Sequence, residues 1–132
     1  MKRNLLIKNG LLIDLGSGFL FDKKDVLIED GIITMISENI EKKGLEVFDA
    51  RGFILSPGFI DVHVHCYYGD TAIGIEPEKI GVETGVTSVV DAGTSGAGTI
   101  DDFYNRIIKN SNTRVFAILN VTTEGLITLR EL

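Results

Sequence analysis

Residues 56–65 read SPGFIDVHVH, and the fold expected for this chain follows from this segment. The apolar run after its proline–glycine pair predicts a buried strand over Phe59–His65. Residues two apart in a strand point to the same side, so His63 and His65 should share one face, with Asp61 below them. Two imidazoles about 6–7 Å apart along a strand can reach one metal ion if the strand curves, and neutral imidazole is a common zinc ligand. The alternative is that both histidines lie at a solvent-exposed strand end and bind no metal.

Strands alternate with helices downstream of this stretch. Apolar runs at 86–91 and 114–119 predict two more strands, and the spacing of about 27 residues between strand starts is typical of βα units and a parallel sheet. Pro77 should open a first helix that Gly85 ends, and Thr99 should cap a second. Residues 126–132 should either begin a further helix or form a short stub. The second helix carries its apolar face on Ile100, Phe103, Tyr104, Ile107 and Ile108.

Each of these three strands ends in a polar group: the histidine pair, Asp91 and Asn120. Functional residues of (β/α)8 barrels lie at the carboxyl ends of the strands, so these groups are candidates for one site. Strands also end in polar residues simply because loops begin there, and that interpretation stays open.

The first half, residues 1–56, is predicted to be a small β-rich unit of short strands. Asn9-Gly10 and Asp30-Gly31 each lie between apolar runs, which is the strongest short signal for a two-residue hairpin. A few short strands need a second layer to bury their apolar face. The expected strands are 4–8, 11–14, 25–29, 32–37, 46–49 and 52–55.

Composition narrows the class of protein. The 132 residues carry a net charge of −6, so a nucleic-acid or anionic-membrane partner is not expected. One cysteine rules out an internal disulfide framework and fits a reducing compartment. The apolar run after Lys2 and Arg3 is interrupted at Lys8, which is too early for a signal peptide, so we expect a cytoplasmic protein.

The stretch at 56–65 resembles the signature strand of the amidohydrolase superfamily, metal-dependent hydrolases with a β-sandwich-like small domain on a TIM barrel. Four further stretches resemble its dihydroorotase-like branch, the amidohydrolase/deacetylase family metallohydrolases: YGDT (68–71), GIEP (74–77), GVTSVVDAGTSGAG (85–98) and NVTTEGL (120–126). The resemblance implies an α/β fold in which residues 1–56 form half of a composite β-sandwich-like subdomain. Residues 57–132 would form the first three βα units of a (β/α)8 TIM barrel, which is incomplete in this chain.

The resemblance also implies the site. His63 and His65 match first-strand ligands of a divalent metal, expected to be zinc, in a family whose intact members hold two ions. Asp61, which the strand alternation puts on the same face as the histidines, would orient them with its carboxylate without binding the metal itself. The bridging lysine, two further histidines and the catalytic aspartate of the family lie on later strands, so the catalytic residues are expected beyond Leu132. Manganese, iron or nickel would also suit histidine with carboxylate.

Three other residues are expected near the substrate: Tyr67, Asp91 and Asn120. Dihydroorotases carry an arginine two residues after the second histidine, where it binds a substrate carboxylate. Tyrosine at position 67 cannot make that bidentate contact, which argues against dihydroorotase activity. Cys66 should point to the opposite side from His65, as a small apolar residue facing a helix.

Three hypotheses for function follow. The first is a metal-dependent amidohydrolase, in which metal-activated water hydrolyses a non-peptide C–N bond or a small acyl ester, and the 132 residues alone are inactive. The second is half of a split enzyme, completed by a separate C-terminal chain. The third is a non-catalytic metal-binding or interaction module. The expected partners are a small-molecule substrate and either a complementing chain or further copies in a homo-oligomer, without nucleic acid or membrane.

Overall fold

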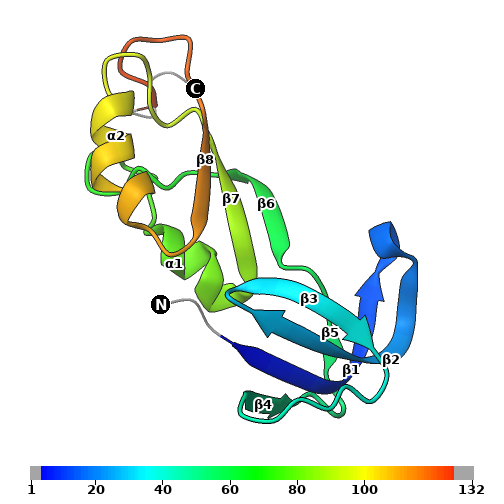
Figure 1. Ribbon diagram of the computed structural model, residues 1–132. Helices are drawn as coiled ribbons and strands as arrows, with labels where there is room; N and C mark the ends of the chain where they lie inside the picture. The colour runs from blue at the N-terminus through cyan, green and yellow to red at the C-terminus, as the bar shows by residue number, and fades with distance from the viewer. Residues whose placement is uncertain (1–3, 127–132) are drawn as a thin grey trace. The chain divides into compact units, whose positions relative to one another are not determined.

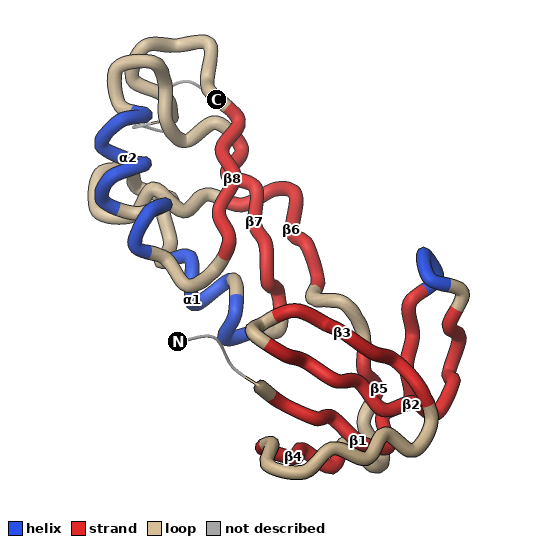
Figure 2. Tube along the Cα trace, in the orientation of Figure 1, coloured by secondary structure: helices blue, strands red, loops and turns tan. Residues whose placement is uncertain are grey.

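The computed structural model describes residues 4–126, which form a mixed α/β structure in which strands dominate (Figure 2). Two compact units divide between Pro57 and Gly58. The helix or stub expected from residue 126 lies, after its first residue, outside the described part of the chain.

The first unit is a five-stranded sheet with the strand order β3-β2-β1-β4, in which β5 also pairs with β1 (Figure 1). The pairs β1–β2 and β2–β3 are antiparallel, whereas β4 and β5 run parallel to β1. Leu6, Leu27 and Ile40 form its buried core. The elements are β1 (Leu5–Asp14), the 3₁₀ turn η1 (Leu15–Ser17), β2 (Phe19–Glu29), β3 (Ile32–Ser37), β4 (Glu46–Asp49) and β5 (Ile54–Leu55).

The hairpin predicted at Asp30-Gly31 is confirmed. It joins β2 to β3, and both turn residues have positive φ, 52° and 78°. A two-residue type I′ turn requires positive φ at both positions, which aspartate tolerates and glycine adopts freely.

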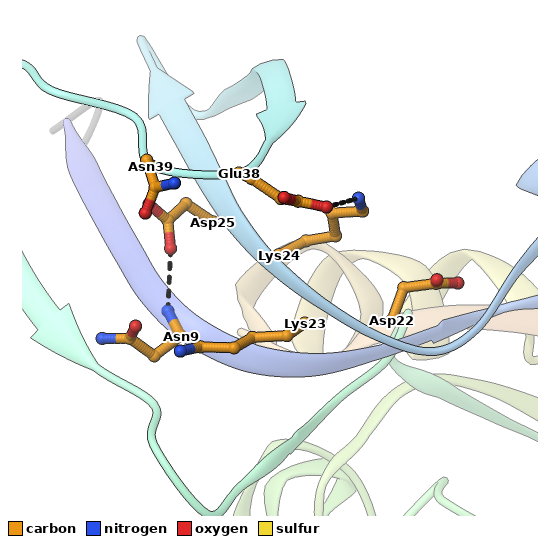
Figure 3. A pocket seen from close by; sticks show the side chains of 7 residues that line it. All are labelled: Asn9, Asp22, Lys23, Lys24, Asp25, Glu38 and Asn39. Atoms are coloured by element: carbon orange, nitrogen blue, oxygen red, sulfur yellow. Dashed lines mark hydrogen bonds and ion pairs between the residues drawn. The ribbon is translucent and has the colours of Figure 1, made fainter.

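The hairpin predicted at Asn9-Gly10 is wrong, because β1 runs through this dipeptide without reversing. The chain forms a β-bulge there: Ile7 pairs with Val26 and Gly10 pairs with Lys24, so β1 has one extra residue. Only Asn9 of the two has positive φ, at 63°. The buried Asp25 of β2 accepts a hydrogen bond from the backbone amide of Asn9 at 2.8 Å (Figure 3). This hydrogen bond stabilises Asn9 in the bulge.

The second unit contains a three-stranded parallel sheet with the order β6-β7-β8, which confirms the prediction from the strand spacing. Figure 1 shows its short helices gathered on one side of the sheet. No helix within residues 4–126 is long and apolar enough to cross a membrane. The elements are β6 (Phe59–Val64), α1 (Pro77–Ile80), η2 (Val82–Thr84), β7 (Val86–Ala92), α2 (Ile100–Arg106), η3 (Ile108–Asn110) and β8 (Arg114–Ile118).

The core of this unit lies between the sheet and α2. Phe103 is fully buried against strand residues that include Val89 and Val115, and Ile107 joins them. Tyr104, expected on the same apolar face of the helix, is 53% exposed. The first helix is shorter than predicted: α1 gives way at Gly81 to the 3₁₀ turn η2, and Gly85 ends η2 with φ of 86°.

The expectation that β6 is buried is wrong for most of the strand. Phe59, Ile60 and Val62 are each 65–68% exposed, and only Val64 is buried. The reason is topological, because β6 is an edge strand of the three-stranded sheet. At the other edge, β8 likewise exposes Phe116 and Ile118.

Glu78 of α1 ties this helix to the segment before β8. Its carboxylate accepts hydrogen bonds from the Ser111 hydroxyl and the Asn112 amide, both at 2.8 Å. Burial alone would raise the pKa of Glu78, but these hydrogen bonds hold the pKa below its ordinary value. The ionised carboxylate is therefore favoured in the folded state.

We expect Glu78 to make this unit sensitive to acid. Because the folded pKa lies below the unfolded one, the stabilisation is present above about pH 4.3 and is lost as pH falls through the folded pKa. Glu78→Gln should flatten the dependence of the urea midpoint on pH between about 3 and 6, whereas Glu83→Gln, at an exposed glutamate of η2, should not. All three tyrosines lie in this unit, so tyrosine fluorescence reports its unfolding. If the urea midpoint of Glu78→Gln depended on pH as it does in the unmodified chain, Glu78 would not be the source of the acid sensitivity.

Candidate functional site

The end of β6 is irregular just where the two histidines lie. Asp61 pairs with Val89 and Val64 pairs with Asp91, so β6 has one more residue than β7 over this interval. The Asp61 carboxylate accepts the His63 amide at 3.0 Å. A bulge bends a strand and re-aims its side chains, which is the local change that would let two neighbouring histidines reach one ion.

The structure brings the rings of His63 and His65 together. Their centroids are 5.5 Å apart and their planes are nearly perpendicular, at 79°. His63 is exposed and His65 is half-buried. A Zn–N distance of about 2.1 Å at a tetrahedral centre puts the centroids of two imidazole ligands roughly 5 Å apart. The spacing and the chemistry of these two donors therefore fit one metal ion.

A buried carboxylate organises the groups behind His65. Asp91, near the end of β7, is fully buried and accepts three hydrogen bonds. They come from the Cys66 amide at 2.8 Å, the Thr94 amide at 2.7 Å and the Thr94 hydroxyl at 2.7 Å. The Thr94 hydroxyl oxygen in turn lies 3.0 Å from Nδ1 of His65. Asp91 thus fastens the backbone after β6 to the loop after β7.

The loops that follow β7 and β8 pack backbone against backbone at the same end of the sheet (Figure 1). The Gly98 amide donates to the Thr123 carbonyl at 2.7 Å, and the Leu126 amide donates to the Thr94 carbonyl at 3.1 Å. A Cβ on Gly96 would lie 2.1 Å from the Thr122 carbonyl oxygen, so only glycine permits this approach. The glycine-rich loop therefore has a packing role.

The side chain of Asn120 connects the loops after β7 and β8 by hydrogen bonds. Its side-chain amide donates to the Gly93 carbonyl at 2.9 Å, and its side-chain oxygen accepts from the amide and hydroxyl of Thr122, both at 2.9 Å. These contacts occupy both ends of the side chain and join the loops after β7 and β8.

No protein-family model matches the chain. A deacetylase of Agrobacterium fabrum is 36% identical to it over 125 residues, which cover 93% of this chain and 31% of the relative. A crystal structure of a dihydroorotase superposes with a TM-score of 0.85 at 32% identity, covering 96% of this chain and 33% of that one. The N-acyl-D-glutamate deacylase of Bordetella bronchiseptica, complexed with zinc and a phosphonate inhibitor, matches at 31% identity and a TM-score of 0.53, over 74% of this chain and 19% of that one.

The chain belongs to the amidohydrolase superfamily. It spans about a third of the length of the deacetylase and of the dihydroorotase. Relatives in this superfamily are generally metal-dependent. Within residues 4–126 of this amidohydrolase chain, no three histidine, cysteine, aspartate or glutamate side chains gather as a metal-binding group.

The side chain of Tyr67 packs against α2. The ring is buried against Phe103 of α2, with centroids 4.9 Å apart, and its hydroxyl donates to Asp102 at 2.7 Å. The Arg106 guanidinium lies over the ring, 5.3 Å from its centroid. In this amidohydrolase chain Tyr67 therefore anchors the segment after His65 to α2, and its expected place near the substrate stays a prediction.

Cys66 is fully buried within the same core cluster as Val64 and Val89, as expected for a residue facing the helix side. Burial raises the pKa of the Cys66 thiol, and the nearby Asp91 carboxylate raises it further. Thiolate is the form of cysteine that binds metals, so Cys66 is not prepared as a ligand.

Sequence reasoning missed Thr94. The spacing between Asp91 and Thr94 could have indicated their contact. An aspartate at a strand end commonly accepts a hydrogen bond from the backbone amide two or three residues later. The side chain of Thr94 carries no chemistry that would single it out as functional. Only the fold brings its hydroxyl to His65.

We expect Tyr67→Phe to destabilise the parallel-sheet unit by about 1–2 kcal/mol, because the packing stays while the hydrogen bond to Asp102 is lost. Tyr104→Phe, at an exposed tyrosine of α2, should change the free energy of unfolding by less than about 0.5 kcal/mol. Urea unfolding of both variants measures the difference. Equal stability of Tyr67→Phe and the unmodified chain would show that the hydroxyl is not a structural anchor.

Proposed function

We propose that this chain carries the first metal-binding strand of a metal-dependent amidohydrolase. The enzyme would hydrolyse a C–N bond other than a peptide bond, or a small acyl ester, in a small-molecule substrate. The observation that carries the proposal is the pair of imidazoles at the carboxyl end of β6, 5.5 Å apart and backed by the Asp91–Thr94 contacts.

His63 and His65 would hold a divalent metal, and zinc fits their nitrogen donors. The bound ion would lower the pKa of a water molecule and polarise the substrate carbonyl. Hydrolysis joins the water oxygen to the acyl carbon and breaks the C–N bond, which leaves a carboxylate and an amine. Asp61 would hold the bulge that aims His63, and the Asp91 network would hold His65.

We further propose that residues from 57 onward are the N-terminal βα units of a (β/α)8 barrel. Three parallel strands with covering helices agree with this arrangement. The apolar side chains exposed on both edge strands agree as well, since neighbouring strands in a barrel would cover them. The five-stranded sheet of the first unit would be half of a composite sandwich.

A deacylase-type substrate is favoured over dihydroorotate. The Agrobacterium deacetylase and the dihydroorotase each align over more than nine-tenths of the chain, so the preference rests on position 67. Tyr67 supplies no guanidinium for a substrate carboxylate, and its hydroxyl is already bonded to Asp102. The proposed substrate is therefore an N-acyl compound or a small acyl ester, and not dihydroorotate.

Cobalt titration of the 132-residue chain tests the metal site. We expect one Co²⁺ per chain, with affinity lowered at least about tenfold in His63→Ala and in His65→Ala, because each removes one of two protein nitrogens. Asp101→Ala, which removes an exposed acid of α2, should bind as the unmodified chain does. Visible absorption of Co²⁺ reports nitrogen ligation directly. Binding that is absent, or unchanged in both histidine variants, would contradict the proposal.

The sequence holds two histidines, one in β6 and one directly after it, so the remaining ligands and the general base are proposed to come from outside these residues. The zinc-loaded chain should accordingly show no hydrolysis of N-acyl amino acids or small acyl esters. Turnover that disappears in His63→Ala would overturn this part of the proposal.

A further inference from the structure

We propose that Asp91 and Thr94 are positioning residues that fix the His65 ring in one tautomer, with the proton on Nδ1 and a free lone pair on Nε2. The inference rests on the proposed function, since it concerns how His65 is prepared as a metal ligand. It assigns to Asp91 and Thr94 a role that the spacing of the histidines alone does not reveal.

The geometry forms a continuous chain of contacts from the carboxylate to the imidazole. One oxygen of Asp91 accepts the Thr94 amide at 2.7 Å, and the other accepts the Thr94 hydroxyl, also at 2.7 Å. Thr94 is therefore held at two points by one carboxylate. Its hydroxyl oxygen then lies 3.0 Å from His65 Nδ1.

Counting protons settles the direction of each bond. A carboxylate only accepts, so the single hydroxyl proton of Thr94 is donated to Asp91. That hydroxyl has no second proton for His65, and its oxygen can only accept. The 3.0 Å contact is therefore Nδ1–H of His65 donating to Thr94. In a neutral ring the other nitrogen, Nε2, is then the acceptor and the available ligand atom.

Because these residues are buried, water cannot take over the hydrogen bonds between Asp91 and Thr94. Asp91 and Thr94 are both fully buried, so water cannot readily supply the contacts that a substitution would remove. The Cys66 amide also donates to the Asp91 oxygen that receives the Thr94 hydroxyl, which fixes the backbone directly after His65. A metal-binding histidine commonly donates its second ring N–H to a fixed acceptor, and that acceptor sets the tautomer and orientation of the ring.

His63 offers an internal comparison. His63 is exposed. Within residues 4–126 its ring makes no hydrogen bond, and it contacts the His65 ring. The Asp61 carboxylate touches the His63 backbone amide, not the imidazole. We therefore expect one fixed tautomer at His65 and no comparable fixation at His63.

Long-range ¹H–¹⁵N NMR of the metal-free chain at pH 8, above the ordinary histidine pKa of about 6.5, reads the tautomer directly. We expect Nδ1–H at His65 in the unmodified chain. Thr94→Val keeps the shape but removes the hydroxyl, so this tautomer should no longer dominate and Co²⁺ affinity should fall about 10- to 100-fold. Thr94→Ser, which restores a hydroxyl, should recover both.

Thr123→Val is the matched control, because Thr123 lies in the loop after β8 and its hydroxyl has no assigned contact in the described residues. It should leave the tautomer and the affinity unchanged. An Nε2–H tautomer at His65 in the unmodified chain would overturn the inference, and that spectrum needs no variant to fold. Unchanged tautomer and affinity in folded Thr94→Val would overturn it too. Absence of Co²⁺ binding with the Nδ1–H tautomer present would instead contradict the proposed function.

Discussion

The buried carboxylate of Asp91 is the interaction on which the carboxyl end of the parallel sheet depends. Burying a charged group is costly unless hydrogen-bond donors surround it, and three donors do so here. One comes from the segment after β6 and two from the loop after β7. The requirement to satisfy this single group therefore fixes two consecutive strand ends relative to each other, and with them the ring of His65.

A second constraint comes from close backbone packing of the loops after β7 and β8. Gly96 and Gly125 allow carbonyl and amide groups to approach where any Cβ would collide, and Asn120 bonds across both loops. The loop that carries Thr94 is consequently held from two sides, by Asp91 within its own βα turn and by the loop after β8. Such rigid support is what a precisely placed ligand requires.

The sequence predicted those features that depend on residues close together in the chain. Three strands at βα spacing, the Asp30-Gly31 turn and the proximity of His63 and His65 follow from periodicity and turn preferences. It failed at Asn9-Gly10, where Asp25 on the neighbouring strand favours a bulge over a reversal of the chain. The contacts of Tyr67 with Asp102 and of Thr94 with His65 were not foreseen, because the partners lie 35 and 29 positions apart in the chain. Contacts at such separations depend on tertiary packing, which no local pattern encodes.

A crystal structure of the zinc-loaded chain would test most directly whether the histidine pair and the Asp91 network form one prepared site. We expect zinc on Nε2 of His65 and on a ring nitrogen of His63, at about 2.0–2.1 Å, with Nδ1 of His65 still bonded to Thr94 and Thr94 to Asp91. Zinc bound elsewhere, or zinc on His65 only after the ring has turned away from Thr94, would contradict it.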